Sequence, residues 1–229
     1  MSVRYSFGQM FFTAGEISFE ESVLLHIARG DCTIEALRDS EIEGDFTSWI
    51  VVLHYGPVPE GLRLEELSNI RAKFIAECDW DSLENAKDSF RKRDIVFHNC
   101  HKSDEVVLWN NFELFYQLHL LQLLDCFAYK QEVSQRLSII YIDEYLWQTT
   151  SESQLERLGK REPVSEKQLV VGQLSWTAFT AQPLELVLEL MQECAPVLPF
   201  LQNALFRLFE EFTEDWSRLP RTEHCLEQV

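Results

Sequence analysis

Four ionisable side chains stand just behind short apolar runs of the chain, where α/β proteins usually place their chemistry. Asp31 follows the run at 23–28, His54 ends the run at 48–54, Glu113 follows the run at 105–109, and Asp143 follows the run at 137–142. Carboxylates and an imidazole can exchange protons with a substrate near neutral pH. If the runs are parallel strands, their carboxyl ends meet at one edge of a sheet. Acidic residues also simply favour helix starts, so the pattern indicates a place for a site without defining a reaction.

The junction from Trp109 to Leu118 joins the third apolar run to a long apolar helix. It begins with two neighbouring amides, Asn110 and Asn111, and carries only one carboxylate, Glu113. Amides bind ligands but do not transfer protons at neutral pH. This composition favours binding over catalysis. His26, inside the first run, is open to both a core role and a functional one.

Alternating apolar runs and helical stretches predict the fold. The runs at 23–28, 48–54, 105–109 and 137–142 are separated by stretches long enough for helical crossovers, with helices expected at 64–78, 81–96 and 112–127. We therefore expect an α/β fold, with a parallel sheet of about four strands and helices on both faces. We expect residues 1–22 to form an N-terminal extension and residues 23–146 to form the α/β domain. We expect residues 147–229 to be an all-helical C-terminal extension packed on that domain, with helices at 151–158, 166–179, 183–194 and 199–212.

Composition restricts the class of partner. The chain has 229 residues, of which 38 are acidic and 20 basic, giving a net charge of −18. This charge repels phosphates and argues against nucleic acid, and the densest basic stretch, Lys87–Arg93, has the pattern of a solvated helix face. No apolar run approaches the roughly 18 residues of a membrane span, and the N-terminus is a poor signal peptide. We expect a cytoplasmic protein whose partner is a small molecule or another protein.

No familiar cofactor or metal motif occurs. The sequence lacks a P-loop, GxGxxG, GxSxG and HExxH, and it has only eight glycines for a phosphate cradle. Six widely spaced cysteines without a CxxC pair indicate free thiols. The cluster from His98 to His101 contains two histidines and Cys100, but no second ligand pair follows at a zinc-finger spacing. We expect reduced cysteines, no metal and no cofactor.

Several of these segments carry a resemblance to a known family. They are His26–Asp31, Val52–Gly61, Leu67–Ala76, Asp104–Trp109, Gln117–Leu124 and Leu137–Leu146. Over roughly residues 24–225 the chain resembles an uncharacterised bacterial family catalogued as domain of unknown function 1835. That family has no established activity to carry over. Leu219–Glu227 resembles a segment that opens a winged-helix-like region in relatives, which implies a truncated or degenerate member.

The departures from the family pattern bear on activity. After the Leu-Trp pair, relatives usually read Phe-Glu-His-Asp-Leu-Tyr-Asp-Gln-Leu. Asn111, Phe112, Glu113 and Tyr116 stand here in place of the Glu, His and two Asp residues. Asn111 and Phe112 cannot transfer protons, and Phe112 cannot bind a metal. If relatives use this cluster for acid–base or metal chemistry, the resemblance implies that the function is damaged here.

These considerations together predict one ligand crevice at the carboxyl ends of the strands. Its candidate residues are Asp31, His54, Gly56, Arg71, Trp109, Asn111, Glu113 and Gln117. Arg71 belongs to a segment that recurs in the resemblance, and its guanidinium could bind an anion or pair with Glu66 or Glu77. We expect a ligand-binding or regulatory protein with a degenerate active-site motif. The alternatives are an enzyme acting on a phosphorylated or nucleotide-like small molecule and a nucleic-acid-linked regulator.

Overall fold

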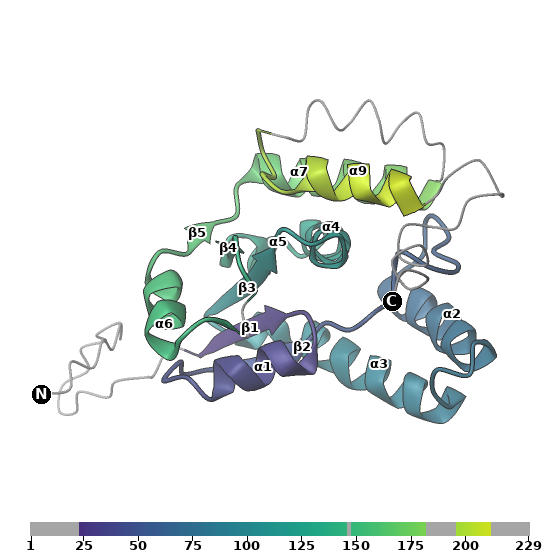
Figure 1. Ribbon diagram of the computed structural model, residues 1–229, viewed down its shortest axis with the longest axis horizontal. Helices are drawn as coiled ribbons and strands as arrows, with labels where there is room; N and C mark the ends of the chain where they lie inside the picture. Colours follow the sequence, from purple (N-terminus) through teal and green to yellow (C-terminus); the bar gives the residue numbers. More distant parts are fainter. Residues whose placement is uncertain (1–22, 146–147, 182–195, 212–229) are drawn as a thin grey trace, which may run out of the picture.

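The computed structural model describes residues 23–145, 148–181 and 196–211, and its centre is a five-stranded sheet (Figure 1). The strands are β1 (Leu24–Ala28), β2 (Asp45–Ser48), β3 (Glu105–Asn111), β4 (Leu137–Ile142) and β5 (Glu162–Pro163), in the order β2-β1-β3-β4-β5. The first four strands are parallel, and β5 pairs antiparallel with β4. The predicted parallel α/β sheet is confirmed, with β5 added at one edge.

The position of the second strand was predicted wrongly. The run at 48–54 was expected to be a strand, but β2 ends at Ser48, and the N–H of Trp49 makes the last bond to β1 by donating to the Ala28 carbonyl at 2.8 Å. Trp49, Val51 and Leu53 are buried as a strand's core-facing residues would be, yet they pack in the core without a partner strand. Alternating apolar residues report burial on one side, and here the neighbours on that side are helices.

Helices cover both faces of the sheet, as predicted (Figure 1). Against one face, α1 (Asp31–Arg38) and α6 (Ser151–Gly159) pack on apolar residues that include Val107 and Ile140. Against the other face, which includes Val106 and Leu108, lie α3 (Leu83–Asn99) and α4 (Leu114–Ala128). The remaining helices are α2 (Leu64–Glu77), α5 (Gln131–Ser134), α7 (Glu166–Ala181), α9 (Leu201–Glu211) and the short 3₁₀ turn η1 (Cys100–Lys102). The predicted helix at 183–194 lies outside the described residues.

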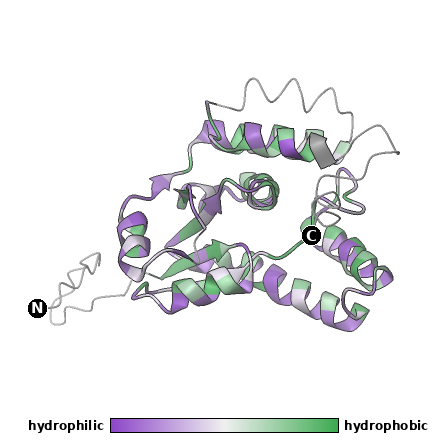
Figure 2. Cartoon of the chain, in the orientation of Figure 1, coloured by the Kyte–Doolittle hydropathy of each residue, from purple (hydrophilic) through white to green (hydrophobic). Residues whose placement is uncertain are grey.

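The central element is α4, which is buried along nearly its whole length. It lies between the sheet and a further layer made by α7 and α9, and Figure 2 shows its mainly hydrophobic colouring. A helix that is apolar on all sides needs such neighbours all round. α7 and α9 therefore complete the core around α4.

The contact between α4 and α7 depends on Gly172. A Cβ atom at this position would lie 2.4 Å from Cβ of Leu124, which side-chain rotation cannot relieve. We expect Gly172→Ala to lower the free energy of unfolding by about 1 kcal/mol or more, because overpacking outweighs the roughly 1 kcal/mol gain in helix propensity. Urea unfolding measures this change. Gly159→Ala in α6 is the matched control: its Cβ would meet no atom within 4 Å, so it should be neutral or stabilising, and equal effects of both substitutions would contradict the packing argument.

Candidate functional site

The strand order changes direction between β1 and β3. From β1 the chain crosses to β2 on one side, and from β3 it crosses to β4 on the other side. The connections that leave the carboxyl ends of β1 and β3 therefore diverge, and open α/β sheets bind ligands in the crevice formed there. Here the two ends lead into Arg29, Gly30 and α1 on one side and into Phe112, Glu113 and α4 on the other.

The ring of Phe115, in the first turn of α4, gathers three basic side chains at this point. The Cζ atoms of Arg29 and Arg207 lie 5.0 and 6.0 Å from its centroid, and the His54 ring lies 4.4 Å from it. They come from the end of β1, from α9 and from the segment after β2. No described carboxylate forms an ion pair with either arginine. The Nε atoms of both arginines are buried without a hydrogen-bond partner among the described residues.

Tyr116 fixes the backbone beside these arginines. Its hydroxyl donates to the Arg29 carbonyl at 3.3 Å and lies 3.0 Å from Oγ1 of Thr33 in α1. Since a phenol has one proton, Thr33 must donate when Tyr116 bonds to Arg29. Burial raises the pKa of Tyr116, so the hydroxyl stays protonated at neutral pH. The bond therefore holds the end of β1 against the start of α4.

A hollow of about 280 Å³ opens between the start of α4 and α9. Its lining residues are Phe112, Glu113, Leu114, Asn203, Ala204, Phe206 and Arg207. Phe112 and Phe206 are 38% and 53% exposed, so two aromatic rings are open to solvent beside a guanidinium and a carboxylate. The hollow is at the small end of the range for ligand sites and suits a small planar or anionic molecule.

Three predicted site residues meet at the start of α4. Oδ1 of Asn111 accepts the backbone N–H of Glu113 at 2.9 Å, and Nε2 of Gln117 donates to the Asn111 carbonyl at 2.6 Å. Asn111 and Gln117 are buried, whereas Glu113 reaches the hollow. The two amides thus hold the strand–helix junction, and Glu113 remains available to a ligand.

His54 and Gly56 belong to the segment after β2, and Arg71 of α2 contacts the backbone of that segment. The Arg71 side chain is fully buried, and its guanidinium donates to the carbonyls of Pro57, at 3.2 Å, and Val52. It pairs with neither Glu66 nor Glu77, and burial lowers its pKa to about 10. Arg71 therefore holds the segment in place and does not face an open crevice. Asp31 is exposed at the first residue of α1.

Trp109 belongs to the interior on the α1 face of the sheet. Its indole N–H donates to Nδ1 of His26 at 3.2 Å, and Nε2 of His26 lies 3.2 Å from the Glu43 carbonyl. His26 must therefore be neutral with its proton on Nε2, and burial lowers its pKa to about 4. Trp109 and His26 form a buried structural pair. The single crevice from Asp31 to Gln117 stays a prediction, and within it the structure brings together only the group at the start of α4 and His54 on Phe115.

Sequence reasoning missed Arg29, Phe115 and Arg207. Arg29 directly follows the first apolar run, so its place at a strand end was a usable signal. Phe115 resembled one more core residue of an apolar helix. Arg207 lies 92 positions after Phe115, and no local pattern joins the two.

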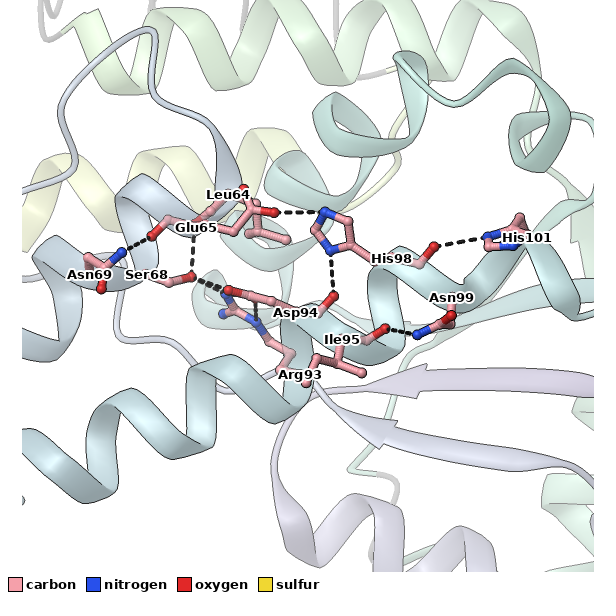
Figure 3. Close-up of polar contacts among 10 residues, drawn as sticks. All are labelled: Leu64, Glu65, Ser68, Asn69, Arg93, Asp94, Ile95, His98, Asn99 and His101. Atoms are coloured by element: carbon pink, nitrogen blue, oxygen red, sulfur yellow. Dashed lines mark hydrogen bonds and ion pairs between the residues drawn. The ribbon is translucent and has the colours of Figure 1, made fainter.

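A second polar cluster has catalytic residue types without catalytic geometry (Figure 3). Oγ of Ser68 in α2 lies 2.8 Å from Oδ2 of Asp94 and 2.7 Å from Nη2 of Arg93, both in α3. His98 contacts Glu65 and the Asp94 carbonyl, so it is not a base for Ser68. Arg93 and Asp94 form a buried ion pair at 2.6 Å. The cluster joins α2 to α3.

Metal ligands do not gather in the part of the chain that the structure describes. No three His, Cys, Asp or Glu side chains lie close enough there to hold an ion. Cys32, Cys78, Cys100 and Cys126 are free thiols, and Cys194 and Cys225 lie outside the described residues. The expectation of a protein without metal stays a prediction. No helix among the described residues is long and apolar enough to cross a membrane.

The buried histidine beside Trp109 predicts acid sensitivity. His26 has a pKa of about 4 in the folded chain against 6.5 when unfolded, so the unfolded state binds the extra proton between these values. The free energy of unfolding should therefore fall as the pH drops from 6.5 to 4, by about 3 kcal/mol from this group. His119, with a pKa lowered to about 3 by burial, adds to the same trend. Urea unfolding at a series of pH values measures it.

The matched variants for this prediction are His26→Gln and His101→Gln. Glutamine cannot titrate, so His26→Gln should flatten the pH dependence whatever its effect on stability at neutral pH. His101 is exposed, and its replacement should leave the change in the free energy of unfolding with pH unaltered. Identical slopes in all three proteins would show that His26 is not the group responsible.

Comparison with known proteins found no relative of this chain. The chain matches no family model, no curated protein and no solved structure.

Proposed function

We propose that this chain is a cytoplasmic ligand-binding or regulatory protein that takes an anionic small molecule between α4 and α9. The observation that carries the proposal is the convergence of Arg29 and Arg207 on the ring of Phe115 without a described carboxylate partner. Two like charges held near one ring repel each other, and an anion between them would remove that repulsion. The positive end of α4 would add to the attraction.

The hollow is lined by Arg207 but not by Arg29, and its other lining residues restrict the chemistry of the ligand. Phe112 and Phe206 offer exposed ring faces, which suit a planar group. The carboxylate of Glu113 would repel a second anionic group, and it can accept a hydrogen bond from a donor of the ligand. A phosphorylated or carboxylated molecule with a planar, hydrogen-bond-donating part satisfies all three requirements.

The resemblance to the family of unknown function is part of this proposal. Its segments His26–Asp31 and Val52–Gly61 contain Arg29 and His54, which lie at Phe115. The position where relatives carry a carboxylate holds Asn111, whose side-chain oxygen accepts the backbone N–H of Glu113 at the start of α4. This role supports a site that binds its ligand without the proton transfer of the intact cluster.

An enzyme acting on a phosphorylated substrate is the second candidate, because the imidazole of His54 lies against the same ring. A positioned histidine contributes about a hundredfold or more as a general acid or base. The test is whether the wild-type protein releases phosphate from a phosphomonoester. If it does, and if His54→Asn abolishes this release while pyrophosphate binding is retained, the second candidate is favoured over the first.

Anion binding can be tested with pyrophosphate as the probe. The melting temperature of the wild-type protein should rise with millimolar pyrophosphate, because a ligand of the folded state stabilises it. Arg29→Gln and Arg207→Gln should each weaken binding at least about tenfold, the effect of losing one charge-assisted hydrogen bond. Titration calorimetry gives the affinities directly.

Arg91→Gln is the matched control. Arg91 is an exposed arginine that pairs with Asp88 on α3, away from the hollow. Its replacement changes the net charge equally and should leave pyrophosphate binding unchanged. Equal losses in all three variants would mean that overall charge governs binding, and no binding by the wild type would remove the proposal.

A further inference from the structure

Three neighbouring aromatic rings, two of them exposed and one half-buried, form a cluster outside the proposed anion site. Tyr55, Phe74 and Trp80 lie with ring centroids 5.6 to 5.9 Å apart, and we call them the aromatic patch. Tyr55 is 57% exposed and Trp80 51% exposed. Large aromatic side chains held in water beside one another are characteristic of protein-binding surfaces.

The turn after α2 holds Trp80 in place. The N–H groups of Asp79 and Trp80 donate to the carbonyls of Ala76 and Ile75, at 3.2 and 3.1 Å, which closes the helix end. This closure requires Asp79 to adopt a φ of 54°, a conformation that glycine or asparagine takes more easily. The turn places the Trp80 ring edge-on to Phe74 of α2.

The position of Tyr55 is fixed by a different set of contacts. The buried guanidinium of Arg71 bonds to the carbonyls of Val52 and Pro57, on either side of Tyr55. Gly56, with a φ of 82°, lies so close to Phe74 that a Cβ atom there would be 2.4 Å from the ring. The backbone therefore lies directly on Phe74, and Tyr55 has little freedom to turn inward. Because these side chains are held in place before a partner binds, they lose little conformational entropy on binding.

The charges around the patch define the partner. Glu77, Asp79 and Asp81 are exposed within three residues of Trp80, and no described basic side chain forms an ion pair with them. Arginine can interact with both the aromatic rings and the carboxylates, because its guanidinium stacks on tryptophan and tyrosine and pairs with carboxylates. A second copy of this chain does not fit, since each copy carries a net charge of −18.

We propose that the aromatic patch binds an arginine-containing segment of a partner protein, with a guanidinium stacked on Tyr55 and Trp80 and neighbouring basic groups on the three carboxylates. The α2–α3 hairpin, which carries Trp80 in its turn, projects from the side of the sheet (Figure 1).

The probe is a synthetic peptide of alternating arginine and leucine, and fluorescence anisotropy measures its affinity. The double variant Tyr55→Ser, Trp80→Ala should bind at least about tenfold more weakly, the loss expected for aromatic anchors. Both side chains are more than half exposed, so the fold should be retained, which circular dichroism checks. Tyr129→Ala removes an aromatic side chain that is 78% exposed elsewhere and should leave the affinity unchanged.

Charge variants give a second, independent test. Glu77→Gln with Asp79→Asn should weaken peptide binding severalfold, and the turn should be kept because asparagine tolerates a positive φ. Glu35→Gln with Asp39→Asn on and after α1 changes the net charge equally and should have no such effect. A peptide with lysine in place of every arginine should bind more weakly to the wild type, because lysine stacks less well.

Two results would overturn the proposal. Equal affinities of the patch variants and the controls would show that the peptide responds only to the overall negative charge. A wild-type dimer in sedimentation equilibrium that Trp80→Ala converts to a monomer would show that the patch is covered by another copy of the chain.

Discussion

The segment from Trp49 to Val58 leaves the sheet and has no strand partner, although Trp49, Val51 and Leu53 are buried, and this constraint explains many of the polar contacts around it. Buried backbone N–H and C=O groups must find hydrogen bonds. Here side chains supply them: Nε2 of His119 contacts the Val51 carbonyl, and Arg71 serves Val52 and Pro57. The amide oxygen of Gln122 in α4 accepts the indole N–H of Trp49 at 2.9 Å. This requirement explains why an apolar helix such as α4 carries buried polar residues.

The same segment connects the two surfaces to which functions are assigned. His54 lies against Phe115 at the start of α4, while the next residue, Tyr55, lies against Phe74 of α2. Arg71 holds the carbonyls on both sides of this pair. Displacing the segment at either end would therefore move a side chain at both surfaces, which gives a direct physical route for coupling between them.

Some of this could be predicted from the sequence, for identifiable reasons. Short apolar runs and long intervening helical stretches leave few topologies besides a parallel sheet, so β1, β3 and β4 were located closely. The second strand was misplaced because Val51 and Leu53 are as buried as strand residues. The alternation of apolar residues does not show whether a backbone carbonyl accepts a hydrogen bond from a neighbouring strand or from a side chain such as Arg71. The short β5 also lacked any apolar signal.

The candidate site was only partly predictable, for a similar reason. Asn111 and Gln117 were correctly placed near a strand–helix junction, but a sequence does not show whether an amide faces a ligand or the backbone. Arg207 reaches Phe115 only because α9 packs across α4. Such a neighbour depends on tertiary packing and has no counterpart in local spacing.

The two-residue strand β5 also determines how the sheet can associate with other chains. It consists of Glu162 and Pro163 and pairs with Ile139 and Ser138 of β4, and a proline has no N–H to offer a further strand. Edge-to-edge pairing is therefore hindered at the start of β4. The opposite edge is β2, which is four residues long and begins with the charged Asp45. Short, charged edge strands resist aggregation, so we expect this sheet not to extend by pairing with strands of other copies of the chain, even at high protein concentration.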